Sequence, residues 1–241
     1  MTYCVGMMLD QGLVFMSDTR TNAGLDNIST FRKMHIWEDS GERVITLLSA
    51  GNLATTQSVI SLLDERSKAP ECRSPTVLAA ESMFQVAQII AGTLQEVIQQ
   101  RTEVGQSSEK SFDATMILGG QIRGGTTRLF LIYPEGNFIE AGADTPFFQI
   151  GEIKYGRPIL VRAYHPTLDF SAALKLMLVS FDSTLRANLT VGPPFDYHCY
   201  EADTFTRGPC GRVESDDPRF LTISEGWSDA LKRALEELPS F

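Results

Sequence analysis

The stretch MTYCVGMMLDQGLVFMSDTR, residues 1–20, decides how the rest of the chain is interpreted. Two apolar segments, residues 4–9 and 13–17, lie on either side of the turn-forming sequence DQG, and this pattern predicts two β-strands. Thr2 lies directly before the first of these strands. We therefore expect the start of the chain to hold a fixed position in the fold.

The residues that follow add a second strand pair and a first helix. Strands are expected at residues 33–38 and 43–49, around the turn DSG. After Asn52 the apolar residues recur at helical spacing instead. We expect a helix over residues 53–66, with Asn52 as its N-cap.

A second helix is expected over residues 75–100, because Ser74 is a good N-cap and Pro75 suits the first helical position. Its apolar residues cover most of its circumference, so we expect it to be buried on more than one side. The remaining strands are expected at residues 114–119, 128–133, 138–141, 147–151, 198–202 and 211–222, with a glycine-rich connection at 119–125. The remaining helices are expected at residues 154–163, 166–186 and 228–238.

This order of elements predicts the fold class. Strands and helices do not alternate one by one, which disfavours a doubly wound parallel sheet. The order fits an α+β fold in which two antiparallel sheets stack face to face and helices cover both outer faces, an αββα sandwich. We found no linker and no internal repeat, so we expect a single domain over residues 1–241.

Composition excludes several classes of protein. The chain has 241 residues, of which 43% are hydrophobic, enough for a large core and too many for a disordered chain. Acidic residues outnumber basic ones by 30 to 21, a net charge of −9. Because nucleic acids and anionic membranes both attract basic surfaces, we expect neither as a partner.

Localisation and cofactors follow from what the sequence does not contain. The first residues lack the pattern of a secretory signal, and the four cysteines form no CxxC pair or zinc motif, so a cytoplasmic protein with reduced thiols is expected. The three histidines form no metal motif, and neither a GxSxG nor a phosphate-binding loop occurs. We expect no metal and no cofactor.

Thr2 carries the first indication of an activity. Removal of Met1 would leave threonine with a free α-amine. The pKa of such an amine is about 7.7–8.0, so it can accept the hydroxyl proton near neutral pH. Nucleophile and base then belong to one residue, which is a known arrangement for amide hydrolysis.

Several short motifs together indicate a family. Besides Thr2, they are SDTRTNAG at residues 17–24, STFRKMH at 29–35, SAGNLATTQ at 49–57 and SFDST at 180–184. With these motifs the chain resembles the proteasome β-type subunits, and within them the bacterial Anbu branch, the ancestral β subunit. The resemblance covers most of the chain and implies the αββα fold of that family.

The resemblance also implies the roles of individual residues. Thr2 is the nucleophile, Lys33 adjusts its acidity, and Asp18 pairs with Lys33. Asp182 is the expected supporting aspartate. Substrate binding is implied for Gly51, whose amide would face the oxyanion, for Thr21 and Asn22, which would bind an extended peptide, and for Ser49 and Leu53, which would line a side-chain pocket.

Two positions depart from the family pattern. Glu152 stands where many relatives have a serine, and a carboxylate there could accept a proton or repel an acidic substrate. Leu185 stands where a supporting serine is usual, so either Thr190 or Ser183 would have to replace that serine. The usual propeptide is also missing, so activation would depend on Met1 removal alone.

The resulting hypothesis is a threonine-type peptidase that cleaves peptides or unfolded proteins. The resemblance implies a homo-oligomer, a ring or a spiral that encloses the active sites, and leaves an unfoldase partner unknown. Two alternatives stay open: an amidohydrolase of the same fold that acts on a small or modified amide, and a scaffold that keeps the fold without turnover.

Overall fold

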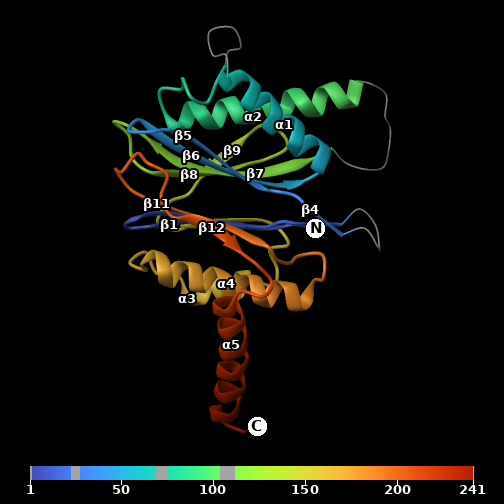
Figure 1. Ribbon diagram of the computed structural model, residues 1–241, viewed down its shortest axis with the longest axis vertical. Helices are drawn as coiled ribbons and strands as arrows, with labels where there is room; N and C mark the ends of the chain where they lie inside the picture. The colour runs from blue at the N-terminus through green and yellow to red at the C-terminus, as the bar shows by residue number, and fades with distance from the viewer. Residues whose placement is uncertain (1, 23–27, 69–74, 104–111, 241) are drawn as a thin grey trace.

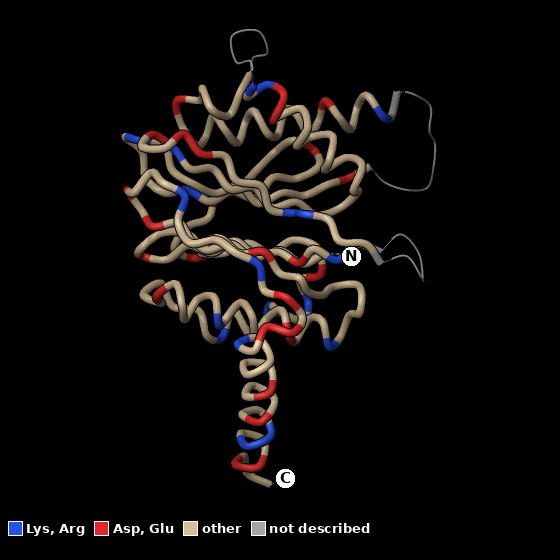
Figure 2. The backbone as a smooth tube through the Cα atoms, viewed as in Figure 1, with Lys and Arg blue, Asp and Glu red and all other residues tan. Residues whose placement is uncertain are grey.

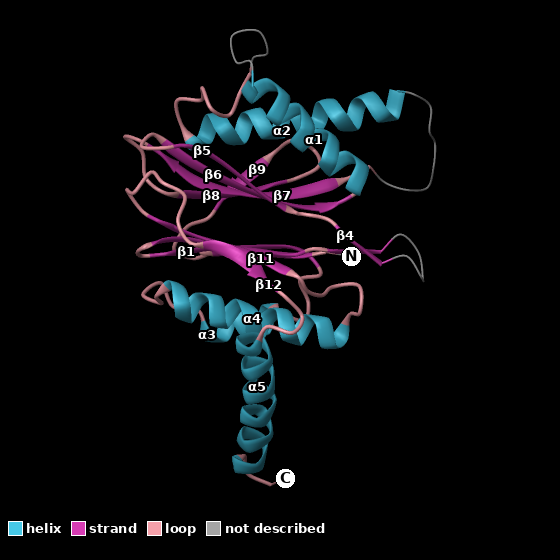
Figure 3. Ribbon diagram, viewed as in Figure 1, coloured by secondary structure: helices cyan, strands magenta, loops and turns pink. Residues whose placement is uncertain are grey.

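The computed structural model describes residues 2–22, 28–68, 75–103 and 112–240. In these residues two antiparallel five-stranded sheets lie face to face, with a helical layer on each outer side (Figures 1 and 3). The predicted α+β class and its αββα layering are therefore confirmed. Among the described residues, no helix combines the length and apolar character that crossing a membrane requires.

The first sheet contains the N-terminal strands. Its order is β10 (Phe147–Gly151), β1 (Tyr3–Leu9), β2 (Gly12–Asp18), β11 (Phe195–Glu201) and β12 (Cys210–Val213). Strand β1 pairs with β2 on one side and with β10 on the other, so both edges of β1 are hydrogen-bonded. The residue that follows Thr2 is thus held from two sides.

The second sheet has the order β5 (Met34–Asp39), β6 (Arg43–Gly51), β7 (Ala114–Ile122), β8 (Arg128–Ile132) and β9 (Phe138–Glu140). A separate two-stranded hairpin, β3 (Arg20–Asn22) and β4 (Ile28–Thr30), links the two sheets along the chain. The sequence analysis missed this hairpin because each of its strands has only three residues and no apolar alternation.

The helices are α1 (Leu53–Lys68), α2 (Met83–Glu103), α3 (Arg157–Ala163), α4 (Phe170–Ala187) and α5 (Pro218–Glu237). The first two cover the second sheet, and α3 and α4 cover the first (Figure 1). Helix α2 packs on the sheet and also on α1, which accounts for its broad apolar surface.

The core forms because side chains alternate between the two faces of each strand. On β2, Phe15 points between the sheets while Met16 points toward α4 and α5. On β6, Leu48 faces the first sheet and Leu47 faces α1 and α2. Gly119 allows close approach of the sheets, since a Cβ there would lie 2.7 Å from the Phe15 ring.

Two boundaries in the first half of the chain differ clearly from the sequence-based prediction. Helix α2 begins at Met83 and not at residue 75, because Ser82 provides the cap, its hydroxyl accepting from the Gln85 amide at 3.2 Å. The predicted cap Ser74 lies outside the described residues. The glycine-rich segment expected as a connection is largely strand, since β7 continues to Ile122. For the first helix, the predicted cap is present: Asn52 Oδ1 accepts from the Thr55 amide at 3.1 Å.

The C-terminal region shows the largest difference. Residues 211–222 were predicted as one strand, but β12 ends at Val213 and α5 begins at Pro218. Asp217 caps this helix and Pro218 occupies its first position, a combination that is typical of helix starts. Helix α5 is therefore 20 residues long and projects from the body of the molecule (Figure 1).

Candidate active site

A buried ion pair lies at the centre of the predicted site. Lys33 Nζ donates to Asp18 Oδ1 at 2.7 Å, and the side chains are 6% and 0% exposed. Lys33 also donates to the carbonyl oxygen of Arg20 at 2.6 Å. A buried ammonium group needs such hydrogen-bond and charge partners, and Asp18 and the Arg20 carbonyl oxygen supply them.

The same carboxylate joins the ion pair to the N-terminal strand. Asp18 Oδ1 accepts from the Tyr3 amide at 3.0 Å, so it lies beside the backbone that follows Thr2. On the other side of Thr2, its carbonyl oxygen accepts from the Glu152 amide at 2.7 Å. The structure therefore pairs Asp18 with Lys33 and places Asp18 beside the residue that follows Thr2, while the catalytic roles of the three residues stay predictions. Met1 lies outside the described residues.

Burial and charge act on Asp18 in opposite directions. Burial has the largest effect and raises the pKa of the Asp18 carboxyl group, while the Lys33 ammonium group and the amides of Tyr3 and Gly192 lower it. Burial also raises the pKa of the Cys4 thiol, which donates to the Ser49 carbonyl oxygen at 3.8 Å. Cys4 is thus a neutral thiol beside the ion pair, unsuited to act as a nucleophile.

Tyr3 anchors the start of β1 through a buried network. Its hydroxyl accepts from Gln149 Nε2 at 2.6 Å and lies 2.7 Å from Ser180 Oγ. Since the Ser180 proton goes to the Gly156 carbonyl oxygen, Tyr3 donates to Ser180. Burial raises the pKa of the Tyr3 phenol, so it keeps the proton that this bond requires.

Ser49 and Gly51 lie on the neighbouring strand β6. The Ser49 amide donates to the Lys33 carbonyl oxygen at 3.0 Å, which places Ser49 next to the ion pair. Gly51 ends β6 with a φ of +118°, and a Cβ there would lie 2.4 Å from the Asp113 carbonyl oxygen. Only glycine fits this position, whose backbone is exposed.

Thr21 and Asn22 lie on β3, in the hairpin next to the site. The side chain of Asn22 is outside the described part of the structure, as are Ala23 and Gly24 of the family motif. Strand β3 begins two residues after Asp18, and Lys33 donates to the carbonyl oxygen of its first residue, Arg20. Their predicted role in binding substrate stays a prediction.

Asp182 has other neighbours. It lies on α4, where its carboxylate accepts from Ser224 Oγ at 2.7 Å and from Arg186 Nε at 3.0 Å. The contact with Ser224 joins α4 to α5, while Arg186 belongs to α4 itself. Ser183 donates to the Val179 carbonyl oxygen of its own helix. The described contacts thus give both residues a structural role, and the supporting roles proposed for them stay predictions.

A second polar cluster lies on the opposite side of Thr2. Glu152 Oε2 accepts from Asn188 Nδ2 at 2.9 Å, and the Thr190 hydroxyl donates to Asn188 Oδ1 at 2.6 Å. Glu152 is only 9% exposed. Sequence reasoning singled out Glu152 and Thr190 but missed Asn188, which connects them. The available signal was asparagine two residues before Thr190, since asparagine side chains often form such turns with the backbone.

Within the described residues, no group of three or more His, Cys, Asp or Glu side chains is arranged to hold a metal ion. The chemistry that the site can supply from its own residues is that of a hydroxyl, an ammonium–carboxylate pair and a second carboxylate. Two facing sheets between helical layers, with this pair beside the backbone that follows Thr2, are the arrangement of the proteasome-like class of N-terminal-nucleophile hydrolases.

Comparison with solved structures identifies the family within this class. Anbu (ancestral β-subunit) from Yersinia bercovieri is 46% identical, with a TM-score of 0.93 over 100% of this chain and 99% of that chain. Anbu from Hyphomicrobium sp. strain MC1 is 47% identical, with a TM-score of 0.90 and coverage of 100% and 99%. The helical assembly of the Anbu complex from Pseudomonas aeruginosa is 44% identical, with a TM-score of 0.92 and coverage of 100% and 98%.

This chain belongs to the Anbu family, the ancestral β-subunits of the proteasome-like hydrolases. No protein-family model and no curated protein matched it in the same comparisons. The resemblance inferred from the sequence motifs is thereby confirmed at the level of the family.

Proposed function

We propose that this protein is a threonine-type peptidase whose nucleophile is Thr2 after removal of Met1. The observation that carries the proposal is the buried Lys33–Asp18 pair, joined to the backbone of Tyr3 directly after Thr2. A buried positive charge beside a hydroxyl favours the alkoxide that attacks a carbonyl group. An ion pair that only stabilised the fold could lie anywhere in the core, whereas this one lies next to the N-terminal strand.

The proposed reaction has two steps. Thr2 Oγ attacks the peptide carbonyl carbon, and the Thr2 α-amine accepts the hydroxyl proton and passes it to the leaving amine as the C–N bond breaks. Water then attacks the resulting ester, with the same amine as base, and releases the acid and free Thr2. Gly51 at the exposed end of β6 would direct its amide toward the oxyanion.

We also propose that the protein acts as a homo-oligomer, a ring or a spiral that encloses its sites in the cytoplasm. Two observations support assembly. The relative from Pseudomonas aeruginosa is described as a helical assembly. In this chain, Leu231 and Leu235 of α5 are 51% and 72% exposed on a helix that projects from the body, and exposed apolar faces often mark interfaces.

The test combines the mature N-terminus with covalent capture of Thr2. We expect intact-mass measurement of protein from cells to show loss of Met1, and an electrophilic peptide probe to acylate Thr2. The exposed thiol of Cys210 could react with the same probe, so the experiment uses a Cys210→Ser background and locates the label by peptide mapping.

In that background, Thr2→Ala should abolish labelling without changing the fold, while Thr2→Ser should keep part of it, since serine retains both a hydroxyl and an α-amine. Labelling that persists in Thr2→Ala, or full activity of protein that retains Met1, would contradict the proposal. Labelling of Thr2 without release of product would favour the scaffold alternative, and turnover of small amides alone would favour the amidohydrolase.

A further inference from the structure

Leu189 is the most exposed large hydrophobic side chain of the described residues, at 82%. A single exposed leucine is ordinary on a protein surface. Leu189 differs because the backbone that carries it is fixed on both sides and lies within two contacts of Thr2.

A turn built by Asn188 presents this side chain. The Asn188 amide ends α4 by donating to the Thr184 carbonyl oxygen at 2.8 Å. Its side-chain oxygen accepts from the Thr190 amide at 3.0 Å, a turn that spans Leu189. Val191 next along the chain is fully buried. With its neighbours on both sides fixed in this way, the backbone holds Leu189 in its exposed position.

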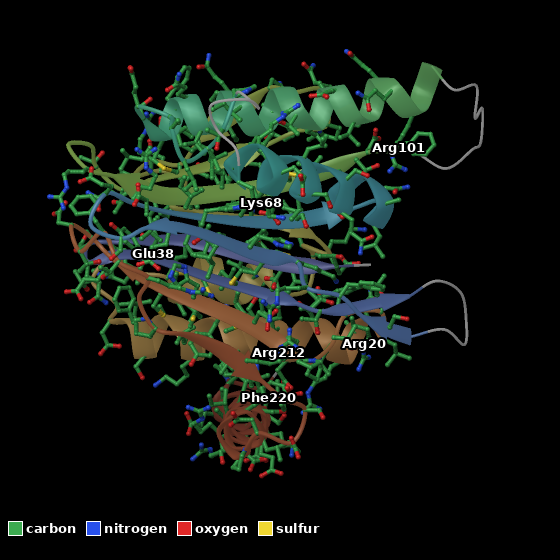
Figure 4. The ribbon with its side chains drawn as sticks, turned by 45° about the horizontal axis from the view of Figure 1, so that its top comes forward. Arg20, Glu38, Lys68, Arg101, Arg212 and Phe220 are labelled. Atoms are coloured by element: carbon green, nitrogen blue, oxygen red, sulfur yellow. The ribbon has the colours of Figure 1, made fainter. Side chains whose placement is uncertain are left out.

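Arg20 fixes the same turn from the β3 side. Its Nη1 donates to the Leu189 carbonyl oxygen at 2.9 Å. Its guanidinium group packs on Gly192, where a Cβ would lie 2.5 Å from Arg20 Cζ. The carbonyl oxygen of Arg20 accepts from Lys33, so one residue connects the turn to the ion pair. Figure 4 shows Arg20 near the base of the β3–β4 hairpin.

The other connection leads to Thr2. Asn188 Nδ2 donates to Glu152 Oε2 at 2.9 Å, and the Glu152 amide donates to the Thr2 carbonyl oxygen at 2.7 Å. The backbone around Leu189 is thus connected by hydrogen bonds to Thr2 through Glu152 and to Lys33 through Arg20. We infer that a substrate bound at Thr2 can reach the apolar side chain of Leu189.

We propose that Leu189 is a specificity-determining residue that contacts an apolar side chain flanking the cleaved bond of a peptide substrate. This inference rests on the proposed peptidase function. Burial of the exposed leucine surface favours an apolar partner. Because the turn is already ordered, binding loses little conformational entropy, so the contact contributes to selectivity.

The test uses two reagents, a set of peptides that differ only in the residues flanking the cleaved bond and a small electrophile without side chains. In Leu189→Ser, we expect kcat/KM for peptides with a flanking leucine to fall roughly tenfold relative to peptides with a flanking serine, the scale of a lost apolar contact. Acylation of Thr2 by the small electrophile should stay unchanged. Val161→Ser is the matched control, since that valine is 59% exposed on α3, and it should leave the preference unaltered.

The outcomes separate the two proposals. An unchanged peptide preference in Leu189→Ser, with normal electrophile labelling, overturns the role of Leu189 and leaves the peptidase proposal standing. A change of sedimentation in Leu189→Ser with unchanged preference overturns it in favour of a subunit interface. Wild-type protein that the electrophile does not label overturns both.

Discussion

The N-terminal site buries charged residues, whereas helix α5 exposes apolar residues. At the site, the charges of Lys33 and Asp18 are buried and paired within the chain. In α5, only Phe220 and Ser224 are buried, while Leu231, Leu235 and Leu238 are 51%, 72% and 63% exposed. Charged residues of both signs accompany these leucines along the helix (Figure 2).

The single chain thus forms its candidate site by itself, whereas the apolar surface of α5 is left exposed. Each half of the site is joined to the sheets by hydrogen bonds, so its geometry is fixed in a single chain. Helix α5 packs against the body through Phe220 and Ile223 and leaves Leu231, Leu235 and Leu238 exposed in the described structure. The geometry of the candidate site is therefore set within one subunit, and α5 is suited to contacts between subunits.

The strongest way to break the site is to remove one charge. In Lys33→Ala, Asp18 would be buried without its partner, which should lower the free energy of unfolding by about 3–5 kcal/mol. Acylation of Thr2 should fall at least about 100-fold, because the charge that favours the alkoxide is lost. Chemical denaturation and probe labelling measure the two effects.

Two variants sharpen this result. Removing Asp18 as well as Lys33 should restore much of the stability but none of the acylation, which separates folding from chemistry. On α5, Lys232→Ala breaks an ion pair whose side chains are 73% and 68% exposed and should change neither quantity. Near-normal labelling of Lys33→Ala would remove Lys33 from the mechanism.

The same contrast governs what the sequence could predict. Most strands were predictable because apolar periodicity is local, and the motifs indicated Thr2, Asp18 and Lys33 because they are specific to the family. Asn188 was not, since its role arises where the end of α4 meets β10, a contact that no local pattern encodes. The start of α5 was missed because the apolar residues of 211–222 outweighed the cap at Asp217.

The next largest effect should appear in α5. Replacing Leu231 and Leu235 by serine together should weaken assembly by about 2–3 kcal/mol, the value expected for burying their exposed surface between subunits. Sedimentation at micromolar concentration should then show a shift toward smaller species. Labelling of Thr2 by a small electrophile should continue in the dissociated subunits. Unchanged sedimentation would show that these leucines lie outside any interface.

A smaller effect should come from pH and should act on the sandwich. His198 is fully buried, its Nδ1 lies 2.9 Å from the Thr46 hydroxyl, and its Nε2 has no hydrogen-bond partner among the described residues. Burial lowers the pKa of His198 from 6.5 to about 4. The unfolded chain therefore binds a proton at His198 more readily than the folded one does. The stability contributed by neutral His198 is fully present above pH 6.5 and is lost as pH falls toward 4.

The expected loss from His198 is about 2 kcal/mol between pH 8 and pH 5. Denaturation of the wild type and of His198→Gln at both pH values isolates this contribution, because all other titrating groups are common to the two proteins. The variant should show a shallower dependence on pH. Equal slopes would mean that His198 is protonated in the folded state or already neutral in the unfolded one.

The smallest effect should follow from removing the cap of α5. Asp217 accepts from the Arg219 amide at 2.8 Å, and its ion pair with Arg219 lowers the pKa of Asp217 to about 2. A lowered carboxyl pKa gives stability that is lost only as pH falls through the pKa of the folded protein. The cap therefore stays ionised at pH 5, a pH at which protonation of His198 already destabilises the two sheets.

In Asp217→Ala, the first turn of α5 should lose about 1 kcal/mol. Hydrogen exchange should detect faster opening of this turn, with no change in β1 or β2 and no loss of Thr2 labelling. Faster exchange throughout the sandwich would instead show that α5 and the site are one cooperative unit.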